Sequence, residues 1–357
     1  MIKNIYFVIP DLRCGGAEKV FINLANSFSK NYSIKFILLE TKGELIDDLN
    51  ENIEIISLDV NRMRFSIFKL IKILKNIRNS YVISAMWPLN CIVMISSIFS
   101  SKSNKFFLTE HVNLSKSIGV DFYSNKIVLF LTVSFTYFLS NKIICVSDGV
   151  RKDLEKFYIF NKTKLVTIYN PIINKSPIKN KNFENSKINI LSVGTLKTQK
   201  DHSTLLKAFS LLKNKSNFHL NIVGDGPLKN QLIKLSINLN IKKYITFHGF
   251  QKNTNQFYQN NDIFILSSIY EGFGNVLVEA LSFGLKIIST NCQNGPSEIL
   301  SNGKYGILVP IKNPQKITEA IYNIQNKKFD PKFLKLRSED FQIDLITNKY
   351  LNIMQSS

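Results

Sequence analysis

Two glutamates eight residues apart, Glu271 and Glu279, flank a glycine–aromatic–glycine core in the stretch EGFGNVLVE (271–279). The glycines open the backbone around Phe273 to close approach by a ligand, and Asn275 can begin a helix. Two carboxylates in one cleft can accept hydrogen bonds from the hydroxyls of a sugar and of a ribose. A surface loop with one capping acid is the alternative, and the pairing of both acids with the core argues against it.

A second loop, GTLKTQK (194–200), carries Lys197 and Lys200 directly after an apolar run. Asp201 or Ser203 can cap the helix that follows. Two cations beside a helix N-terminus can bind a diphosphate. A solvated loop with ordinary lysines explains the same residues equally well. The Walker A pattern is missing, which argues against a P-loop NTPase.

Four further positions follow apolar runs. His111 could hydrogen-bond a substrate hydroxyl or move a proton, although a lone histidine is more often structural. The pair Gly15-Gly16 after Cys14 could bring backbone N–H groups to an anion or a sugar, and a structural tight turn explains it equally well. The turns at Gly224 and at Gly249-Phe250 could line the same cleft, and the second could offer a ring to a base.

Short β-branched runs that alternate with longer helical patterns must position these loops. The alternation is typical of βαβ units around a parallel sheet. The predicted strands are 5–9, 34–39, 53–58, 81–85, 106–109, 142–146, 165–168, 188–193, 219–223, 245–248, 263–266, 286–289 and 306–309. The predicted helices are 17–29, 67–78, 90–99, 124–139, 203–212, 228–239, 276–282, 314–325 and 343–354.

The asparagine-rich stretch 171–187 interrupts the alternation and is predicted to be a linker. It separates an N-terminal domain, 1–170, from a C-terminal domain, 188–342, and the last helix, 343–357, is expected to pack back on the N-terminal domain. We therefore expect an α/β protein with two Rossmann-like domains that face each other across a cleft. Ligands of such sheets bind beyond the carboxyl ends of the strands, so the cleft is the expected active site. Two domains without a shared site are the alternative.

Composition narrows the class of protein. Of the 357 residues, 45% are hydrophobic, which excludes wholesale disorder. The net charge of +20 indicates either an anionic partner or a lysine-rich coding bias, and its even spread argues against nucleic-acid binding. Four widely spaced cysteines predict neither a zinc site nor a disulfide framework, which favours the cytoplasm. The apolar run 127–139 is shorter than the roughly 20 residues that a membrane span needs, and the N-terminal run is too short for a signal peptide.

These motifs, in this order, resemble the family 4 retaining glycosyltransferases of the GT-B fold over almost the whole chain. The most specific are Glu271 and Glu279 as E-x₇-E, VGTLKTQKDHSTLLKAF (193–209) and STNCQNGPSEILSNGKYGILVP (289–310). The last two look most like enzymes that build bacterial surface polysaccharides or lipid-linked oligosaccharides. The resemblance implies a nucleotide-sugar donor, often a UDP-sugar, in the C-terminal domain and a glycan or polyprenyl-linked acceptor against the N-terminal domain. It implies no cofactor and no metal, and no D-x-D metal motif is evident.

Residue roles follow from the resemblance alone. It places Lys200 on the donor diphosphate, Glu271 near the donor sugar and Glu279 on the ribose. It also places Gly16 near the phosphates and His111 near the transferred sugar, so that His111, Glu271 and Lys200 would be the catalytic set. The other donor-binding positions are Thr195, Lys197, Gly224, Gly249, Phe250, Gly272, Phe273, Gly274, Asn275 and Val276.

Thr195 departs from the family pattern, which usually has Arg at this position. The missing charge-assisted contact would cost on the order of 1.5–3 kcal/mol, and stabilisation of the leaving group would then rest on Lys200 and Lys197. This departure motivates an alternative, a weakly active or inactive nucleotide-sugar-binding scaffold protein. A GT-B nucleotide-sugar epimerase is a further alternative.

The segment RMRFSIFKLIKILKNIR (62–78) has six basic residues and no acidic one. On a helical wheel its aliphatic residues share one face, while Phe65, Phe68, Lys69 and Lys72 lie on the other. An outer face of phenylalanine and lysine suits an anionic membrane surface, here the inner face of the plasma membrane. An ordinary solvated face explains the pattern equally well.

Overall fold

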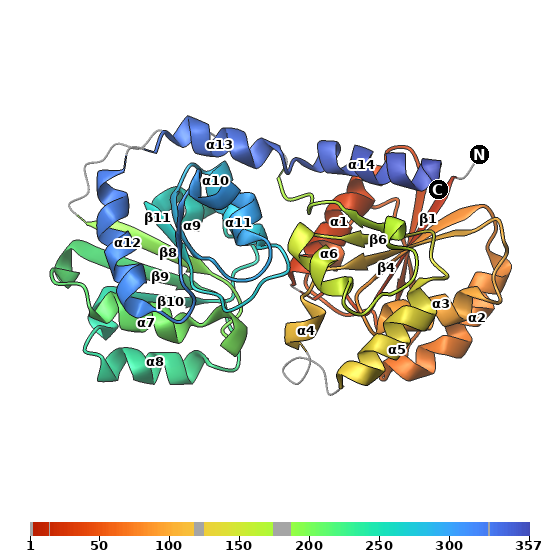
Figure 1. Cartoon of the computed structure of the whole chain (residues 1–357), viewed down its shortest axis with the longest axis horizontal. Coiled ribbons are helices and arrows are strands. Elements are labelled where there is room, and N and C mark those ends of the chain that lie inside the picture. The colour runs from red at the N-terminus through yellow and green to blue at the C-terminus, as the bar shows by residue number, and fades with distance from the viewer. Residues whose placement is uncertain (1–2, 14, 118–124, 174–186, 328) are drawn as a thin grey trace. The chain divides into compact units, whose positions relative to one another are not determined.

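The computed structural model describes residues 3–13, 15–117, 125–173, 187–327 and 329–357, which divide into two compact units (Figure 1). Unit 1 comprises Met1–Ile172 together with Ile343–Ser357, and unit 2 comprises Ile173–Gln342. Cys14 and most of the predicted linker 171–187 lie outside the described residues. No helix within those ranges is both long enough and apolar enough to span a bilayer.

The described part of unit 1 contains a parallel sheet in the order β3-β2-β1-β4-β5-β6-β7. Its strands are β1 (Asn4–Ile9), β2 (Ser33–Leu38), β3 (Glu54–Ser57), β4 (Ser80–Ala85), β5 (Lys105–Glu110), β6 (Lys142–Cys145) and β7 (Leu165–Thr167). Its helices are α1 (Gly16–Phe28), α2 (Ser66–Asn76), α3 (Leu89–Ser97), α4 (Leu114–Ser117), α5 (Lys126–Tyr137), α6 (Asp148–Leu154) and α14 (Ile343–Ser356). The central strands are nearly continuous apolar runs because helices cover both faces of the sheet.

The core of unit 1 is aromatic around Phe7 on β1. The Phe7 ring lies 5.5 Å from Phe21, 6.3 Å from Phe28 and 5.1 Å from Phe36, and all four side chains are buried. The last helix, α14, packs against α1 in the same unit. The Lys30 Nζ lies 3.6 Å from the Asp344 carboxylate at that contact.

Unit 2 repeats the plan with a parallel sheet in the order β10-β9-β8-β11-β12-β13 among the described residues. Its strands are β8 (Ile188–Val193), β9 (Phe218–Val223), β10 (Ile245–Gly249), β11 (Ile263–Leu266), β12 (Lys286–Thr290) and β13 (Ile307–Val309). Its helices are α7 (His202–Ser210), α8 (Lys229–Asn238), α9 (Asn255–Asn260), α10 (Asn275–Ser282), α11 (Pro296–Ile299), α12 (Pro314–Asn326) and α13 (Pro331–Glu339). The strand order reverses between β8 and β11, and ligands of such sheets bind at that reversal.

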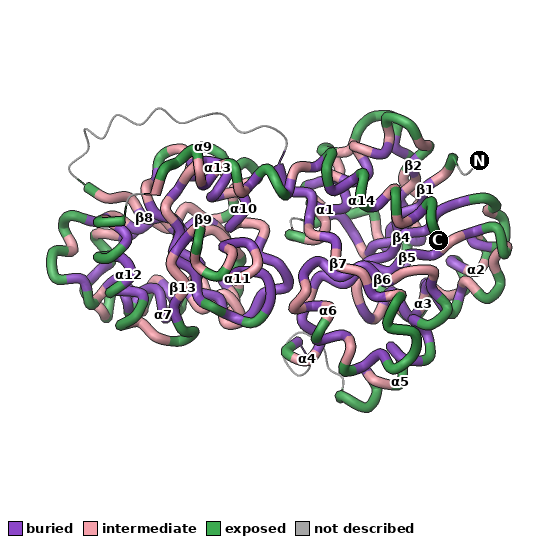
Figure 2. Tube along the Cα trace, turned by 45° about the horizontal axis from the view of Figure 1, so that its top comes forward, coloured by how far each residue is buried: buried purple, intermediate pink, exposed green. Residues whose placement is uncertain are grey.

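One face of the second sheet packs against α7, α8 and α12. Figure 2 shows buried segments, drawn in purple, within both units. Ile190, Leu220 and Ile222 of the sheet lie there against Leu205 and Ile321 of the helices. The predicted strands and long helices all occur, with ends that shift by a few residues. The helices α6, α9 and α13 were not predicted, because these short segments are rich in polar residues and carry no clear apolar period.

Candidate functional site

Lys200 and Glu271 form a buried ion pair where the strand order of the second sheet reverses. Lys200 follows β8 and Glu271 follows β11, and these two strands are neighbours. The Lys200 Nζ lies 2.6 Å from the Glu271 Oε1, and the Ser268 hydroxyl donates to the same oxygen at 2.6 Å. The Glu271 side chain is 7% exposed and that of Lys200 is 17% exposed. An ammonium and a carboxylate held out of bulk solvent therefore form the polar centre of the candidate site.

Three hydrogen bonds to backbone carbonyls join the two loops that carry this pair. The Gln199 side-chain amide donates to the Tyr270 carbonyl at 2.8 Å, and the Ile269 N–H donates to the Gln199 carbonyl at 2.8 Å. The Ser267 hydroxyl donates to the Lys200 carbonyl at 2.8 Å. These bonds fix the two loops relative to each other before any ligand binds, which is the preorganisation that electrostatic catalysis requires.

The N-terminus of α7 beside Lys200 is already occupied by its own cap. Asp201, one of the two predicted capping residues, accepts from the Thr204 N–H at 3.3 Å and from the Thr204 and Ser203 hydroxyls at 2.7 Å. The Asp201 carboxylate takes one N–H of this helix end, as the capping prediction requires, and adds a negative charge beside Lys200. A diphosphate at this position would therefore depend mainly on the lysines of the loop.

Three glycine turns, at the ends of β8, β9 and β10, are joined by backbone hydrogen bonds. The Gly194 N–H donates to the Val223 carbonyl at 3.0 Å, and the Gly224 N–H donates to the Gly249 carbonyl at 2.8 Å. Gly224 has a φ of 139°, and a Cβ there would lie 2.1 Å from the Gly194 carbonyl oxygen. Only glycine fits that contact, so the turns present a backbone surface at the carboxyl ends of three neighbouring strands.

The loop 272–275 is anchored by the Phe273 ring. Phe273 is buried, and its ring lies 5.5 Å from Phe341 in an edge-to-face arrangement. Gly274 adopts a φ of 101°, and α10 begins at the next residue, Asn275, whose side chain is not the N-cap. A Cβ on Gly295 would lie 1.8 Å from the Phe273 carbonyl oxygen, so the neighbouring turn closes on this loop. The Phe273 side chain thus stabilises the loop that follows Glu271, in which Gly272 and Gly274 are buried and Val276 is half-buried.

Glu279 lies on α10, and its carboxylate accepts a hydrogen bond from a tyrosine of α9. The Tyr258 hydroxyl donates to the Glu279 Oε2 at 2.7 Å. Tyr258 is fully buried and stacks on Phe283 at 5.5 Å, and burial raises the pKa of its phenol well above the usual value. A neutral phenol therefore orients this carboxylate. No signal in the sequence paired Tyr258 with Glu279, because the two residues belong to different helices.

Three of the remaining predicted donor residues lie in unit 2 and are at least partly exposed. Thr195 is exposed and Lys197 is half-buried. The Phe250 side chain, directly after the Gly249 turn, is also exposed. Gly16 and His111, which the resemblance assigns to the same donor, lie in unit 1.

Gly16 is the first residue of α1 and is exposed. The Glu18 carboxylate lies over the neighbouring Gly15, because a Cβ there would be 2.0 Å from the Glu18 Oε2. Burial raises the pKa of this Glu18 carboxyl. The position of this carboxyl beside the Gly15-Gly16 turn was not predicted. In the sequence, Glu18 has the pattern of an ordinary acidic residue in the first turn of a helix.

His111 directly follows β5 and is nearly buried against Phe21, with 5.6 Å between the ring centroids. The Thr109 hydroxyl donates to the Ser84 carbonyl at 2.9 Å, so toward the His111 Nε2, 3.1 Å away, it can only accept. Nε2 therefore carries the proton, and Nδ1 is a buried acceptor with no hydrogen-bond partner among the described residues. Burial lowers the pKa of His111 to about 3, so the ring is neutral at physiological pH.

Glu110, beside His111, is a buried acid that the sequence did not single out. Its Oε1 accepts from the Trp87 N–H at 3.1 Å, from the Asn90 amide at 2.8 Å and from the Tyr137 hydroxyl. Burial raises the pKa of Glu110 to about 7. This carboxyl ties the turn after β4 to the end of β5, the strand that positions His111.

The residues predicted on the outer face of the segment 62–78 are all exposed, namely Phe65, Phe68, Lys69 and Lys72. Phe68 is 78% exposed and Phe65 55%, while Leu70 and Leu74 of the opposite face are fully buried. The Lys69 ammonium also donates to the carbonyl of Leu58, so its charge is partly engaged by the protein itself.

Exposed apolar side chains continue from α2 onto α3 and α5, which lie side by side in Figure 1. We call this set the apolar face; its members beyond Phe65 and Phe68 are Ile95, Ile98, Phe99, Ile127, Val128, Leu131, Phe135, Phe138 and Leu139. Ile127 is 69% exposed and Phe135 61%. The sequence predicted a helix here, but not that so much of it faces solvent. Among the described residues, no three His, Cys, Asp or Glu side chains are grouped so as to hold a metal ion.

Comparison with known proteins matches both units to glycosyltransferases. Residues 14–173 match the sequence model of "Glycosyltransferase Family 4", and residues 174–337 match that of "Glycosyl transferases group 1". An uncharacterized glycosyltransferase of Methanocaldococcus jannaschii is 31% identical over 269 residues, which is 68% of this chain and 66% of that protein.

A second relative is N-acetylgalactosamine-N,N'-diacetylbacillosaminyl-diphospho-undecaprenol 4-alpha-N-acetylgalactosaminyltransferase of Campylobacter jejuni. It is 26% identical over 331 residues, or 90% of this chain and 89% of the relative.

Solved structures share the fold at low sequence identity. The Anabaena protein HepE in complex with UDP and glucose superposes with a TM-score of 0.83 at 15% identity, covering 99% of this chain and 100% of HepE. The lipopolysaccharide outer core galactosyltransferase WaaB superposes with a TM-score of 0.76 at 20% identity, covering 99% of both chains. With two parallel α/β units and a family match over each, the chain belongs to the GT-B glycosyltransferases of family 4.

Proposed function

We propose that this chain is a retaining glycosyltransferase that moves a sugar from a UDP-sugar to a lipid-linked glycan during the synthesis of a bacterial surface polysaccharide. The observation that carries the proposal is the buried Lys200–Glu271 pair at the strand reversal of unit 2. That position is where a doubly wound sheet binds its ligand. The pair offers an anionic diphosphate a cation and offers sugar hydroxyls a carboxylate.

Each polar group of unit 2 has a role in this proposal. The Lys200 ammonium stabilises the negative charge that develops on the diphosphate as the bond to the sugar breaks. Glu271 accepts hydrogen bonds from the transferred sugar, and Glu279, oriented by Tyr258, accepts from the ribose hydroxyls. The glycine turns at Gly194 and Gly224 let the backbone approach the nucleotide. Because Lys200 supplies the positive charge, we propose that the reaction needs no metal ion and no cofactor.

Retention of the anomeric configuration is proposed from the family and from the state of Glu271. Its Oε1 is bound by both Lys200 and Ser268, which makes this carboxylate a weak nucleophile. A front-face reaction then fits better than a covalent intermediate: the acceptor oxygen forms the new bond on the side the diphosphate leaves, and a phosphate oxygen takes the acceptor's proton. In unit 1, the His111 Nδ1, which has no partner among the residues that the structure describes, would accept a hydrogen bond from a sugar hydroxyl.

The donor and acceptor classes are proposed from the named relatives. The HepE structure contains UDP and glucose, which favours UDP as the nucleotide here. The Campylobacter jejuni relative acts on a saccharide carried by diphospho-undecaprenol, which favours a polyprenyl-linked acceptor. The acceptor would bind against unit 1.

A lipid-linked acceptor requires contact with a membrane, and the apolar face supplies a surface for it. Its exposed phenylalanines and aliphatic side chains lie on or beside α2, α3 and α5, and the exposed Lys72 and Lys75 also lie on α2. Apolar side chains beside basic ones suit the anionic inner leaflet. We therefore propose a cytoplasmic protein bound peripherally to the inner face of the plasma membrane.

An assay of UDP release tests the function. The chain is incubated with single UDP-sugars, with and without polyprenyl-diphosphate-linked glycan, and the anomeric configuration of the product is read by proton NMR. Acceptor-dependent UDP release with a retained anomer is expected. No turnover with any donor, despite donor binding, would instead identify a scaffold protein, and conversion of the donor's sugar without an acceptor would identify an epimerase.

A further inference from the structure

The strands β9 and β10 have an unusual pattern for a parallel sheet covered by helices. Their sequences, FHLNIV and ITFHG, alternate apolar and polar residues, whereas strands covered on both faces are nearly continuous apolar runs. The apolar residues pack against α7 and α8 in the core. The polar ones therefore share the opposite face of the sheet, and they leave it without an apolar covering layer.

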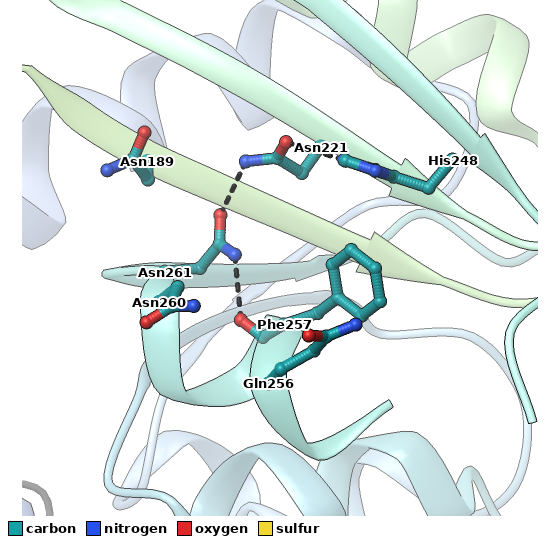
Figure 3. Close-up of a pocket in the computed structure, with 7 residues that line it drawn as sticks. All are labelled: Asn189, Asn221, His248, Gln256, Phe257, Asn260 and Asn261. Atoms are coloured by element: carbon teal, nitrogen blue, oxygen red, sulfur yellow. Dashed lines mark hydrogen bonds between the residues drawn. The ribbon is translucent and has the colours of Figure 1, made fainter. Parts of the chain in front are cut away.

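This polar face forms a pocket of about 380 Å³ beside the short helix α9 (Figure 3). Such a volume lies in the range of small-molecule sites. The strands contribute Asn189, Asn221 and His248, and α9 and the residue after it contribute the rest. The full lining is Asn189, Asn221, His248, Gln256, Phe257, Asn260 and Asn261. None of these side chains is ionised when the imidazole is neutral, and burial together with His219 lowers the pKa of His248.

A chain of hydrogen bonds fixes the direction of each group in the pocket. The Phe257 carbonyl can only accept, so the Asn261 amide nitrogen, 2.7 Å away, donates to it. The Asn261 oxygen then accepts from the Asn221 amide nitrogen at 2.9 Å, and the Asn221 oxygen accepts from the His248 Nε2 at 2.8 Å. The proton of His248 is therefore on Nε2, and its Nδ1 is left as an acceptor.

Further hydrogen-bonding capacity in the pocket is unused. The side chains of Asn189, Gln256 and Asn260 make no hydrogen bond within the described part of the chain, and Gln256 and Asn260 are exposed. Each amide offers both donors and an acceptor. The Phe257 ring, 4.7 Å from the His248 ring in an edge-to-face arrangement, adds an apolar surface among them.

We propose that this polar pocket on β8, β9, β10 and α9 is a second carbohydrate-binding site, which takes a neutral oligosaccharide. Neutral amides pair with hydroxyl groups as donors and as acceptors, and the aromatic ring suits the C–H face of a sugar. The lining has no lysine or arginine to hold a phosphate and no carboxylate to hold a cation. The site is distinct from Lys200 and Glu271, and binding there does not require that the chain transfers sugar.

Saturation-transfer NMR tests the proposal with maltotriose and triacetylchitotriose as neutral probes and trigalacturonate as an anionic one. Each measurement is made first without UDP and then with saturating UDP, which fills the proposed donor site. We expect transfer to at least one neutral probe and little to the anionic one. The double variant Gln256→Ala/Asn260→Ala should weaken binding at least about tenfold, because it removes two exposed amides from the pocket without breaking any hydrogen bond of the fold.

The matched control is Gln231→Ala/Asn238→Ala, which removes two exposed amides from α8 on the opposite side of the sheet. This variant should bind the neutral probes as the parent does. The ¹⁵N shifts of His248 give a second readout, because a saccharide hydroxyl bound at Nδ1 should shift that nitrogen. The proposal is overturned if neither neutral probe binds, if the α9 variant binds unchanged, or if UDP abolishes the signal.

Discussion

The Lys200 ammonium lies 2.6 Å from the Glu271 carboxylate, although 71 positions of the chain separate the two residues. Their strands, β8 and β11, are neighbours only because the strand order of the sheet reverses between them. The same reversal that defines the fold thus creates the buried charge pair. A diphosphate that enters beside Lys200 would compete with Glu271 for the cation and leave Glu271 nearer to the sugar.

Tyr258 should matter for donor affinity rather than for the chemical step. Tyr258→Phe removes the hydrogen bond to Glu279, which the proposal places on the ribose. Binding that is equal in ground and transition states changes KM alone, so we expect the donor KM to rise about tenfold with kcat nearly unchanged. Steady-state kinetics with varied UDP-sugar measure both constants. Tyr350→Phe is the control, since its buried hydroxyl has no partner among the described residues; an equal effect of both variants would argue against the assignment.

Gly224 should be irreplaceable, because its Cβ would overlap backbone. Gly224→Ala sets a Cβ 2.1 Å from the Gly194 carbonyl oxygen at a φ of 139°. Gly303→Ala is the matched control, with a φ of 100° and no atom within 4 Å. We expect the control to lower the free energy of unfolding by about 1 kcal/mol from backbone strain alone, and Gly224→Ala by about 3 kcal/mol or more, with loss of nucleotide binding. Similar urea midpoints for the two variants would contradict the role of this turn.

Glu110 should make the protein less stable as the pH rises toward neutrality. Burial raises its pKa from 4.5 to about 7, so between these values the folded state binds a proton that the unfolded state has lost. The stabilisation is fully present below the unfolded pKa and is lost as the pH rises through the folded pKa. A shift of this size corresponds to about 3 kcal/mol. Urea unfolding of the parent and of Glu110→Gln from pH 4.5 to 8 measures it, and parallel pH profiles would refute the contribution.

The apolar face should bind anionic vesicles. Leu131→Asp/Phe135→Asp inserts two charges into its centre on α5 and should weaken sedimentation with phosphatidylglycerol-containing vesicles by at least about tenfold. Lys72→Glu should weaken it less, since one basic residue contributes about 1 kcal/mol. Leu336→Asp, at an exposed leucine of unit 2, is the control. Equal binding by the α5 variant and the control would exclude this face as the membrane contact.

The sequence singled out the residues of the proposed donor site, but it did not predict the contacts among them. Lys200 and Glu271 were recognisable because glycine-rich turns after apolar strands recur at ligand sites. Three contacts were not predicted, because each depends on elements that are distant in the chain. They are the ion pair of Lys200 and Glu271, the hydrogen bond from Tyr258 to Glu279, and the hydrogen bonds of the buried Glu110. The α5 run was correctly judged too short to span a membrane, but it is apolar on nearly every side, and its period therefore gave no indication of which side faces solvent.

The most direct test of the central claim is calorimetric titration of UDP into the parent, Lys200→Ala and Lys207→Ala. Lys207 is an exposed lysine in the last turn of α7, the helix that follows Lys200, and serves as the matched control. If Lys200 is the cation that holds the diphosphate, its loss should weaken UDP binding at least about tenfold, while Lys207→Ala should bind as the parent does. Equal affinity for UDP in the parent and in Lys200→Ala, with both folded, would contradict the account.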